Sequence, residues 1–102
     1  MPPYTIYDSQ RQEMIAQIGA MNIAAISGGR IGPIDDGIEL PVGNGYRVRV
    51  QLDPSDTYTV TRIFRRKGKD FIHGVRTDVY CDEVGKVAYR ASCYRSYGEE
   101  EW

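Results

Sequence analysis

The sequence is poor in the residues that usually fill a hydrophobic core. Its 102 residues include only two leucines, two phenylalanines and one tryptophan, against eight tyrosines. Basic and acidic side chains number 13 and 14, so net charge does not oppose folding, and 41% of the residues are hydrophobic. We therefore expect one small domain over residues 1–102, with a short acidic tail at residues 99–102 and a core that depends on tyrosine.

Long apolar runs are also missing. No stretch approaches the roughly 18 apolar residues that a membrane-spanning helix needs. The first residues show no basic region followed by an apolar run, so no secretory signal is visible. These absences predict a cytoplasmic protein without a membrane association.

Metal-ligating and catalytic patterns are absent as well. There is one histidine, His73, and neither the CxxC nor the HxxxH spacing occurs around it or the two cysteines. No local motif brings a nucleophile next to a base. The sequence therefore predicts no metal site, no cofactor and no enzymatic activity, and His73 is expected at the edge of the core.

The N-terminal part predicts a helix from about Ser9 to about Ile26. Ser9 and Gln12 have the spacing of a capping box, and apolar residues then recur at helical intervals as far as Met21 and Ala25. A break near Gly19 or a restart at Asn22 fits the same pattern. The following residues 30–44 are rich in proline, glycine and aspartate, which is typical of a surface connection.

Three strands are expected next. Residues 46–52 alternate perfectly between apolar and polar side chains, so Tyr46, Val48, Val50 and Leu52 should face the core. Residues 57–65 form a second strand, in which a bulge near Thr61 or Arg62 would restore the apolar pattern. A third strand spans residues 71–77, with Phe71 and Val75 inward.

A second helix is expected from Asp78 to about Tyr97. Its apolar stripe contains Tyr80, Val84, Val87, Ala88, Ala91 and Tyr94. Cys81 and Cys93 would then lie on one helix, too far apart for a disulfide. The expected fold is α+β: an N-terminal helix, a three-stranded antiparallel meander, and a C-terminal helix packed on one sheet face. A fourth short strand near residues 38–42 is an option.

Basic residues concentrate in the expected sheet. Residues 45–80 carry eight basic and four acidic side chains, whereas both flanking regions are net acidic. Strand alternation places Arg47 and Arg49 outward, the bulge would add Arg62, and Arg76 would lie beside them. This face is a candidate for binding phosphates or an acidic partner. The same arginines are also typical of a solvated sheet face, and the sequence pI of about 5.8 is unlike that of most nucleic-acid-binding domains.

A second stripe of large side chains lies opposite the apolar stripe of the expected C-terminal helix. Tyr89, Cys93 and Tyr97 follow one another at intervals of four residues, and Trp102 comes shortly after them. Tyrosine and tryptophan are enriched in interfaces, so this stripe is a candidate surface for a partner or for self-association. Alternatively, the N-terminal residues or the connection at residues 30–44 cover it.

Three parts of the chain carry a resemblance: residues 22–30, residues 40–46 together with 56–60, and residues 78–85 together with 91–94. In these segments the sequence resembles small uncharacterised proteins encoded by tailed phages of actinobacteria, especially mycobacteriophages. The resemblance implies a non-structural protein made in the cytoplasm of a bacterial host, and it carries no site residue. Small phage proteins of this type often bind a host or defence protein.

The leading hypothesis is therefore a protein that acts by binding another protein, from the host or from the phage. Two surfaces are candidates: the outer stripe of the C-terminal helix with Trp102, and the basic sheet face. The alternative hypothesis is a nucleic-acid-binding protein that contacts phosphates through Arg47, Arg49, Arg62 and Arg76.

Overall fold

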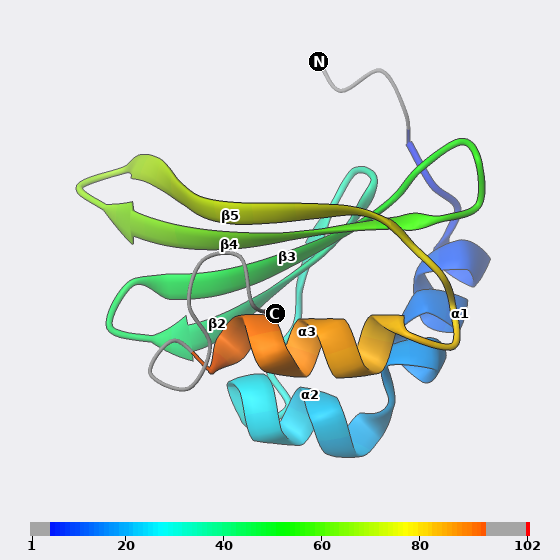
Figure 1. Ribbon diagram of the computed structural model, residues 1–102, viewed down its shortest axis with the longest axis horizontal. Helices are drawn as coiled ribbons and strands as arrows, with labels where there is room; N and C mark the ends of the chain where they lie inside the picture. The colour runs from blue at the N-terminus through cyan, green and yellow to red at the C-terminus, as the bar shows by residue number, and fades with distance from the viewer. Residues whose placement is uncertain (1–4, 94–101) are drawn as a thin grey trace.

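The computed structural model describes residues 5–93 and residue 102. Within this part of the chain, three helices lie on one face of a five-stranded antiparallel sheet with the order β1-β2-β3-β4-β5 (Figure 1). We call this face of the sheet inner and the opposite face outer. The α+β class is confirmed, and the sheet is larger than the expected meander. The elements are α1 (Asp8–Ile18), α2 (Ala20–Ser27), β1 (Gly32–Ile34), β2 (Gly37–Gly43), β3 (Tyr46–Leu52), β4 (Tyr58–Arg66), β5 (Lys69–Val79) and α3 (Val84–Ser92).

A glycine divides the N-terminal helical region into two helices. Gly19, with a φ of 94°, separates α1 from α2, so the expected break near this residue is confirmed. The helical phase does not continue across the break. Met21, predicted to face the core, is consequently 88% exposed. The N-cap of α1 is Tyr7, two residues before the predicted Ser9. The backbone N–H of Tyr7 donates to Oε1 of Gln10 at 2.7 Å.

The segment before β3 is a buried strand. β2 pairs with β3 along most of its length, and Ile38 and Leu40 are fully buried. The expected surface connection over residues 30–44 is therefore wrong for this part, and the optional strand near 38–42 exists and is longer. Pro41 lies beside a register shift, where a sheet tolerates proline, so its turn-forming character misled the prediction.

The central hairpin follows the sequence pattern closely. β3 has the predicted bounds, and its residues Val48, Val50 and Leu52 face the helices and are buried. β4 pairs with β3 without interruption from Tyr58 to Phe64. This unbroken register fixes which β4 side chains face the core.

The bulges of the sheet lie on β5. At two places β4 advances by two residues while β5 advances by three, and Gly74 and Asp78 adopt positive φ values of 138° and 55° there. β4 therefore stays in phase with β3, and the prediction that a bulge turns Arg62 outward is wrong. On β5, Phe71 lies on the inner face as predicted but is exposed beyond the edge of the core. The prediction that Val75 points inward is wrong, because Val75 pairs with Thr61 on the outer face.

The C-terminal helix is shorter than predicted. β5 extends to Val79, so Asp78 lies in a strand and Tyr80 is exposed in the turn before α3. α3 ends at Ser92, and the expected end near Tyr97 lies outside the described residues, as does Tyr94. The predicted apolar stripe is otherwise confirmed. Its buried members are Val84, Val87, Ala88 and Ala91.

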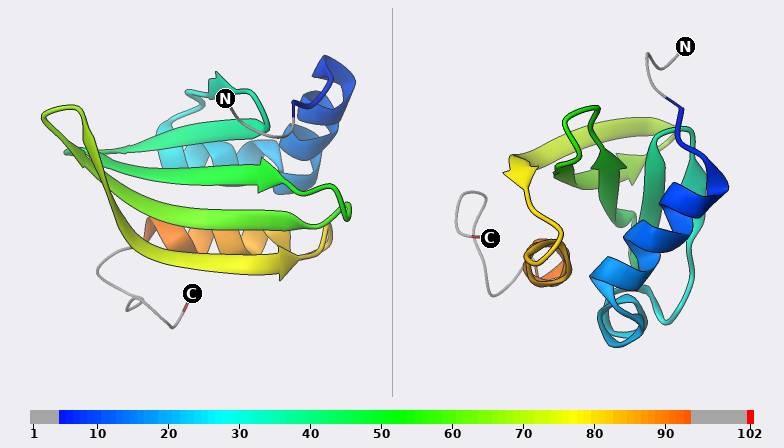
Figure 2. Two further views of the ribbon diagram at one scale, coloured as in Figure 1. Left: turned by 90° about the horizontal axis from the view of Figure 1, so that it is seen from above. Right: turned by 90° about the vertical axis from the view of Figure 1, so that its right-hand side faces the viewer.

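The core lies between the helices and the curved inner face of the sheet (Figure 2). The hydroxyl of Tyr58, a predicted core residue, donates to Oε1 of Gln17 and so joins β4 to α1. Burial, followed by the nearby Glu13 carboxylate, raises the pKa of Tyr58 to about 12.

No helix in residues 5–93 has the length and apolar character needed to cross a bilayer.

Candidate functional site

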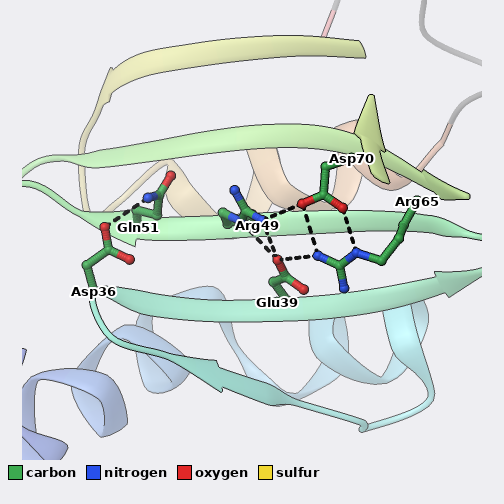
Figure 3. Close-up of polar contacts among 6 residues, drawn as sticks. All are labelled: Asp36, Glu39, Arg49, Gln51, Arg65 and Asp70. Atoms are coloured by element: carbon green, nitrogen blue, oxygen red, sulfur yellow. Dashed lines mark hydrogen bonds and ion pairs between the residues drawn. The ribbon is translucent and has the colours of Figure 1, made fainter. Parts of the chain in front are cut away.

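Four charged side chains form an ion-pair network on the outer face of the sheet. Arg49 donates to Glu39 at 2.7 Å and to Asp70 at 3.2 Å (Figure 3). Arg65 donates to Asp70 at 2.6 Å and to Glu39 at 3.2 Å. The four residues come from β2, β3, β4 and β5, so the network links four neighbouring strands. The guanidinium of Arg49 is therefore already ion-paired within the molecule, which argues against a role as a phosphate ligand.

The network lowers the pKa of both carboxyls. Burial by itself would raise the pKa of Glu39, but hydrogen bonds and Coulomb attraction from Arg49 and Arg65 together outweigh burial and hold it below 4.5. The hydrogen bond from Arg65 is the main cause of the lowered pKa of Asp70. The same hydrogen bond raises the pKa of Arg65. The carboxylates thus remain ionised in mildly acidic solution.

Glu39→Gln is expected to reduce the acid sensitivity of the fold. A carboxyl with a lowered pKa stabilises the folded state above its ordinary value of 4.5, and this contribution disappears as the pH falls through the lowered value. In urea denaturation at several pH values between about 7 and 3, the free energy of unfolding of the variant should fall less with decreasing pH than that of the wild type. Glu13→Gln, which removes an exposed carboxyl outside the network, should retain the wild-type pH dependence.

The four arginines proposed to contact phosphates do not share a face. Arg47 and Arg49 lie on the outer face, whereas Arg62 pairs in register with the core residue Val48 and is 2% exposed. Arg76 lies opposite Val60 on the inner face, and its guanidinium donates to the backbone oxygen of Trp102. A phosphate backbone following one sheet face would therefore not meet all four side chains.

The predicted stripe on the C-terminal helix is also only partly present. Tyr89 is exposed on α3, whereas Cys93 is the half-buried residue that follows the helix. Trp102 is 3% exposed and packs against Arg62, whose guanidinium carbon is 5.5 Å from the ring centroid. Tyr97 lies outside the described residues. Trp102 is thus part of the packed structure and not of an exposed stripe.

The two cysteines do not lie on one helix, because Cys81 is in the turn before α3. Both are free thiols, as expected, although the argument that led to this expectation placed Cys81 wrongly.

Exposed apolar side chains gather on the edge strand β5. Phe71, Ile72 and Val75 are 49%, 53% and 55% exposed. β5 ends the strand order, so in the described part of the chain only β4 pairs with it. An edge strand with exposed apolar residues on both faces is a natural docking place for another extended segment.

An aromatic cluster occupies the inner face at the same end of the sheet. Tyr46 and Phe64 have ring centroids 4.9 Å apart, and Phe64 is 6.4 Å from Phe71. His73 lies 6.2 Å from Phe64, so it belongs to the rim of this cluster, as predicted for a residue at the core edge. The cluster supports Phe71 from within the molecule, which holds its side chain in place for a contact.

Hollows open on the described surface beside α1 and beside β1. One, of about 310 Å³, lies between α1 and the β3–β4 turn and includes Glu13, Asp56 and Tyr58. The other, of about 260 Å³, lies beside β1 and includes Arg30 and Arg47.

Comparison with protein-family models, with curated proteins and with solved structures finds no match to this chain. The resemblance to phage proteins therefore stays a prediction.

Sequence reasoning missed the β5 edge because it placed Phe71 and Val75 in the core. The signal that was available is Gly74, since an isolated glycine within a strand pattern often marks a bulge. A bulge at that residue reverses the facing of the side chains beyond it.

Proposed function

We propose that the protein binds another protein by adding an extended, acidic segment of the partner to the edge of β5. The observation that carries this proposal is the exposure of Phe71, Ile72 and Val75 on an edge strand. Main-chain hydrogen bonds to β5 would give affinity, and contacts with these side chains would give specificity.

The geometry of β5 limits the length of the docked segment. Lys69, Asp70, Phe71 and Ile72 pair regularly with β4, and the first bulge follows at Gly74. A regular ladder on the free side therefore extends over only the first residues of the strand. Phe71 on the inner face and Ile72 on the outer face provide apolar contacts on both sides of the incoming segment.

Charge around the β4–β5 turn favours an acidic partner. Arg66, Lys67 and Lys69 are exposed at this turn, whereas Asp70 is ion-paired with Arg65 and Arg49. The end of the edge thus presents an excess of positive charge, which attracts acidic side chains and raises the association rate. The resemblance to small phage proteins favours a protein of the bacterial host as the partner.

A designed peptide can stand in for the partner in a test of this proposal. The probe is a peptide of about eight residues in which valine and glutamate alternate. It is expected to bind and to protect from hydrogen exchange those backbone amides of residues 69–73 that point away from β4, as measured by NMR. Ile72→Lys should weaken binding by about tenfold or more, because it places a charge in the apolar contact.

Two controls separate edge pairing from other modes of binding. An N-methylated version of the peptide cannot form the ladder hydrogen bonds and should not bind. Tyr89→Ala removes the exposed aromatic side chain of α3 and should leave binding unchanged. Equal losses for Ile72→Lys and Tyr89→Ala, or equal binding of a valine–lysine peptide, would contradict the proposal.

A further inference from the structure

Alternation along the β4–β5 hairpin determines which backbone groups β5 offers at its outer edge. The backbone N–H of Arg65 donates at 2.7 Å to the carbonyl oxygen at the end of the β2–β3 turn, so Arg65 bonds toward β3. Neighbouring residues of a strand bond to opposite sides, and Phe64 therefore bonds toward its partner Phe71 on β5. On either side of Phe71, Asp70 and Ile72 consequently point their N–H and carbonyl groups away from β4.

The two faces of this edge carry different side chains. Phe71 points to the inner face, so Lys69, two residues before it, also points inward, where it pairs in register with Arg66 of β4. Ile72 points outward and pairs with the buried Ile63. The inner face of the edge is therefore cationic at the turn and apolar at Phe71, whereas the outer face is apolar at Ile72.

Positive charge at the turn is available to a partner, whereas the charge of Asp70 is already neutralised. Arg66 and Lys69 are exposed, and within residues 5–93 and 102 neither forms a salt bridge. Asp70 is paired with Arg65 at 2.6 Å and with Arg49 at 3.2 Å. An acidic side chain of a docked segment therefore finds its counter-charge opposite Lys69, and a neutral side chain suits the place opposite Asp70.

We propose that the β5 edge selects a segment whose residues are apolar, apolar, neutral and acidic in that order, read from the N-terminus. This inference rests on the edge pairing proposed above. The four strand pairings described for the sheet are all antiparallel, and an antiparallel ladder is slightly more stable than a parallel one. In this orientation the four residues of the segment lie opposite Ile72, Phe71, Asp70 and Lys69. The edge thereby distinguishes the direction of a segment as well as its composition.

Two peptides of identical composition test the direction. The probe is Thr-Thr-Val-Val-Thr-Glu-Thr-Thr, blocked at both ends, and the control is the same sequence reversed, Thr-Thr-Glu-Thr-Val-Val-Thr-Thr. In NMR titrations of the full chain, the probe should protect the backbone amides of Asp70 and Ile72 from hydrogen exchange. It should bind about fivefold more tightly than the control, because only the probe places valine opposite Ile72 and glutamate opposite Lys69 in one antiparallel register.

Charge exchange at Lys69 tests the acidic position. Lys69→Glu should weaken binding of the probe by about fivefold and favour a peptide in which lysine replaces the glutamate, because like charges directly opposite repel. Lys86→Glu makes the same change of charge on the exposed surface of α3, which begins beyond the far end of β5. It should leave the preference for the probe over its lysine version unchanged.

The outcomes separate the selected order from the edge pairing itself. Equal affinities of the probe and the reversed control, or equal effects of Lys69→Glu and Lys86→Glu, would overturn the selected order. Edge pairing would still stand in that case if the peptides protect the amides of Asp70 and Ile72. If neither peptide protects these amides, the edge pairing and the selected order are both wrong.

Discussion

Gly37→Ala is expected to lower the free energy of unfolding by about 3 kcal/mol or more, or to prevent folding. A Cβ atom at this residue would lie 1.9 Å from the carbonyl oxygen of Val50 and 2.9 Å from Cα of Gln51. Both are backbone atoms of β3, so relief would require β2 and β3 to separate. Chemical denaturation followed by circular dichroism measures the loss.

Gly32→Ala is the matched control for this substitution. A Cβ at Gly32 would lie 3.6 Å from the carbonyl oxygen of Glu39, which is ordinary van der Waals contact. Its stability should stay within about 1 kcal/mol of the wild type, because alanine also reduces the entropy of the unfolded chain. Similar losses for the two variants would show that β2 does not approach β3 as closely as the structure has it.

Arg62→Ala is expected to lower the free energy of unfolding by about 3 kcal/mol. The Nε of Arg62 donates to the carbonyl oxygen of Ala91 at 2.7 Å. Ala91 lies in the last turn of α3, where carbonyl groups have no partner within the helix and positive charge is favourable. Truncation leaves a cavity and removes the donor from this carbonyl.

The matched variants separate charge from volume. Arg62→Met retains most of the buried chain without the charge and should lose less than half as much stability as Arg62→Ala. Arg66→Ala, on the exposed end of β4, should change stability by less than about 0.5 kcal/mol. Trp102 is the single tryptophan, so its fluorescence should shift to longer wavelength when the Arg62 contact is lost. Equal effects of Arg62→Ala and Arg66→Ala would contradict the assigned role.

Elements with an unbroken periodic pattern could be predicted from the sequence. β3 alternates without a fault, and its bounds agree with the prediction. Gly19 identifies the break between α1 and α2 because glycine readily adopts the positive φ that the turn requires. The apolar stripe of α3 is likewise confirmed from Val84 to Ala91. In each case, the information lies within the element itself.

Arg62 shows what the sequence could not reveal. In a period-2 pattern, an arginine at a core position indicates an error in the register, so the sequence favours a bulge. In the structure, its partner is the end of a helix that lies 29 positions further along the chain. Only the packing of α3 on β4 brings the two together. Because Arg62 and Trp102 are buried, neither belongs to an exposed binding surface. The exposed apolar residues of β5 form the candidate surface instead.

The bulges on β5 also affect how safely the protein can expose this strand. A long, flat and apolar edge would template the addition of further copies and lead to fibrous aggregation. Here, the positive φ values of Gly74 and Asp78 interrupt the ladder. Copies of the chain therefore cannot stack along the full length of β5. The strand remains open to one short segment while resisting unlimited self-assembly, so removal of the bulge at Gly74 should increase aggregation.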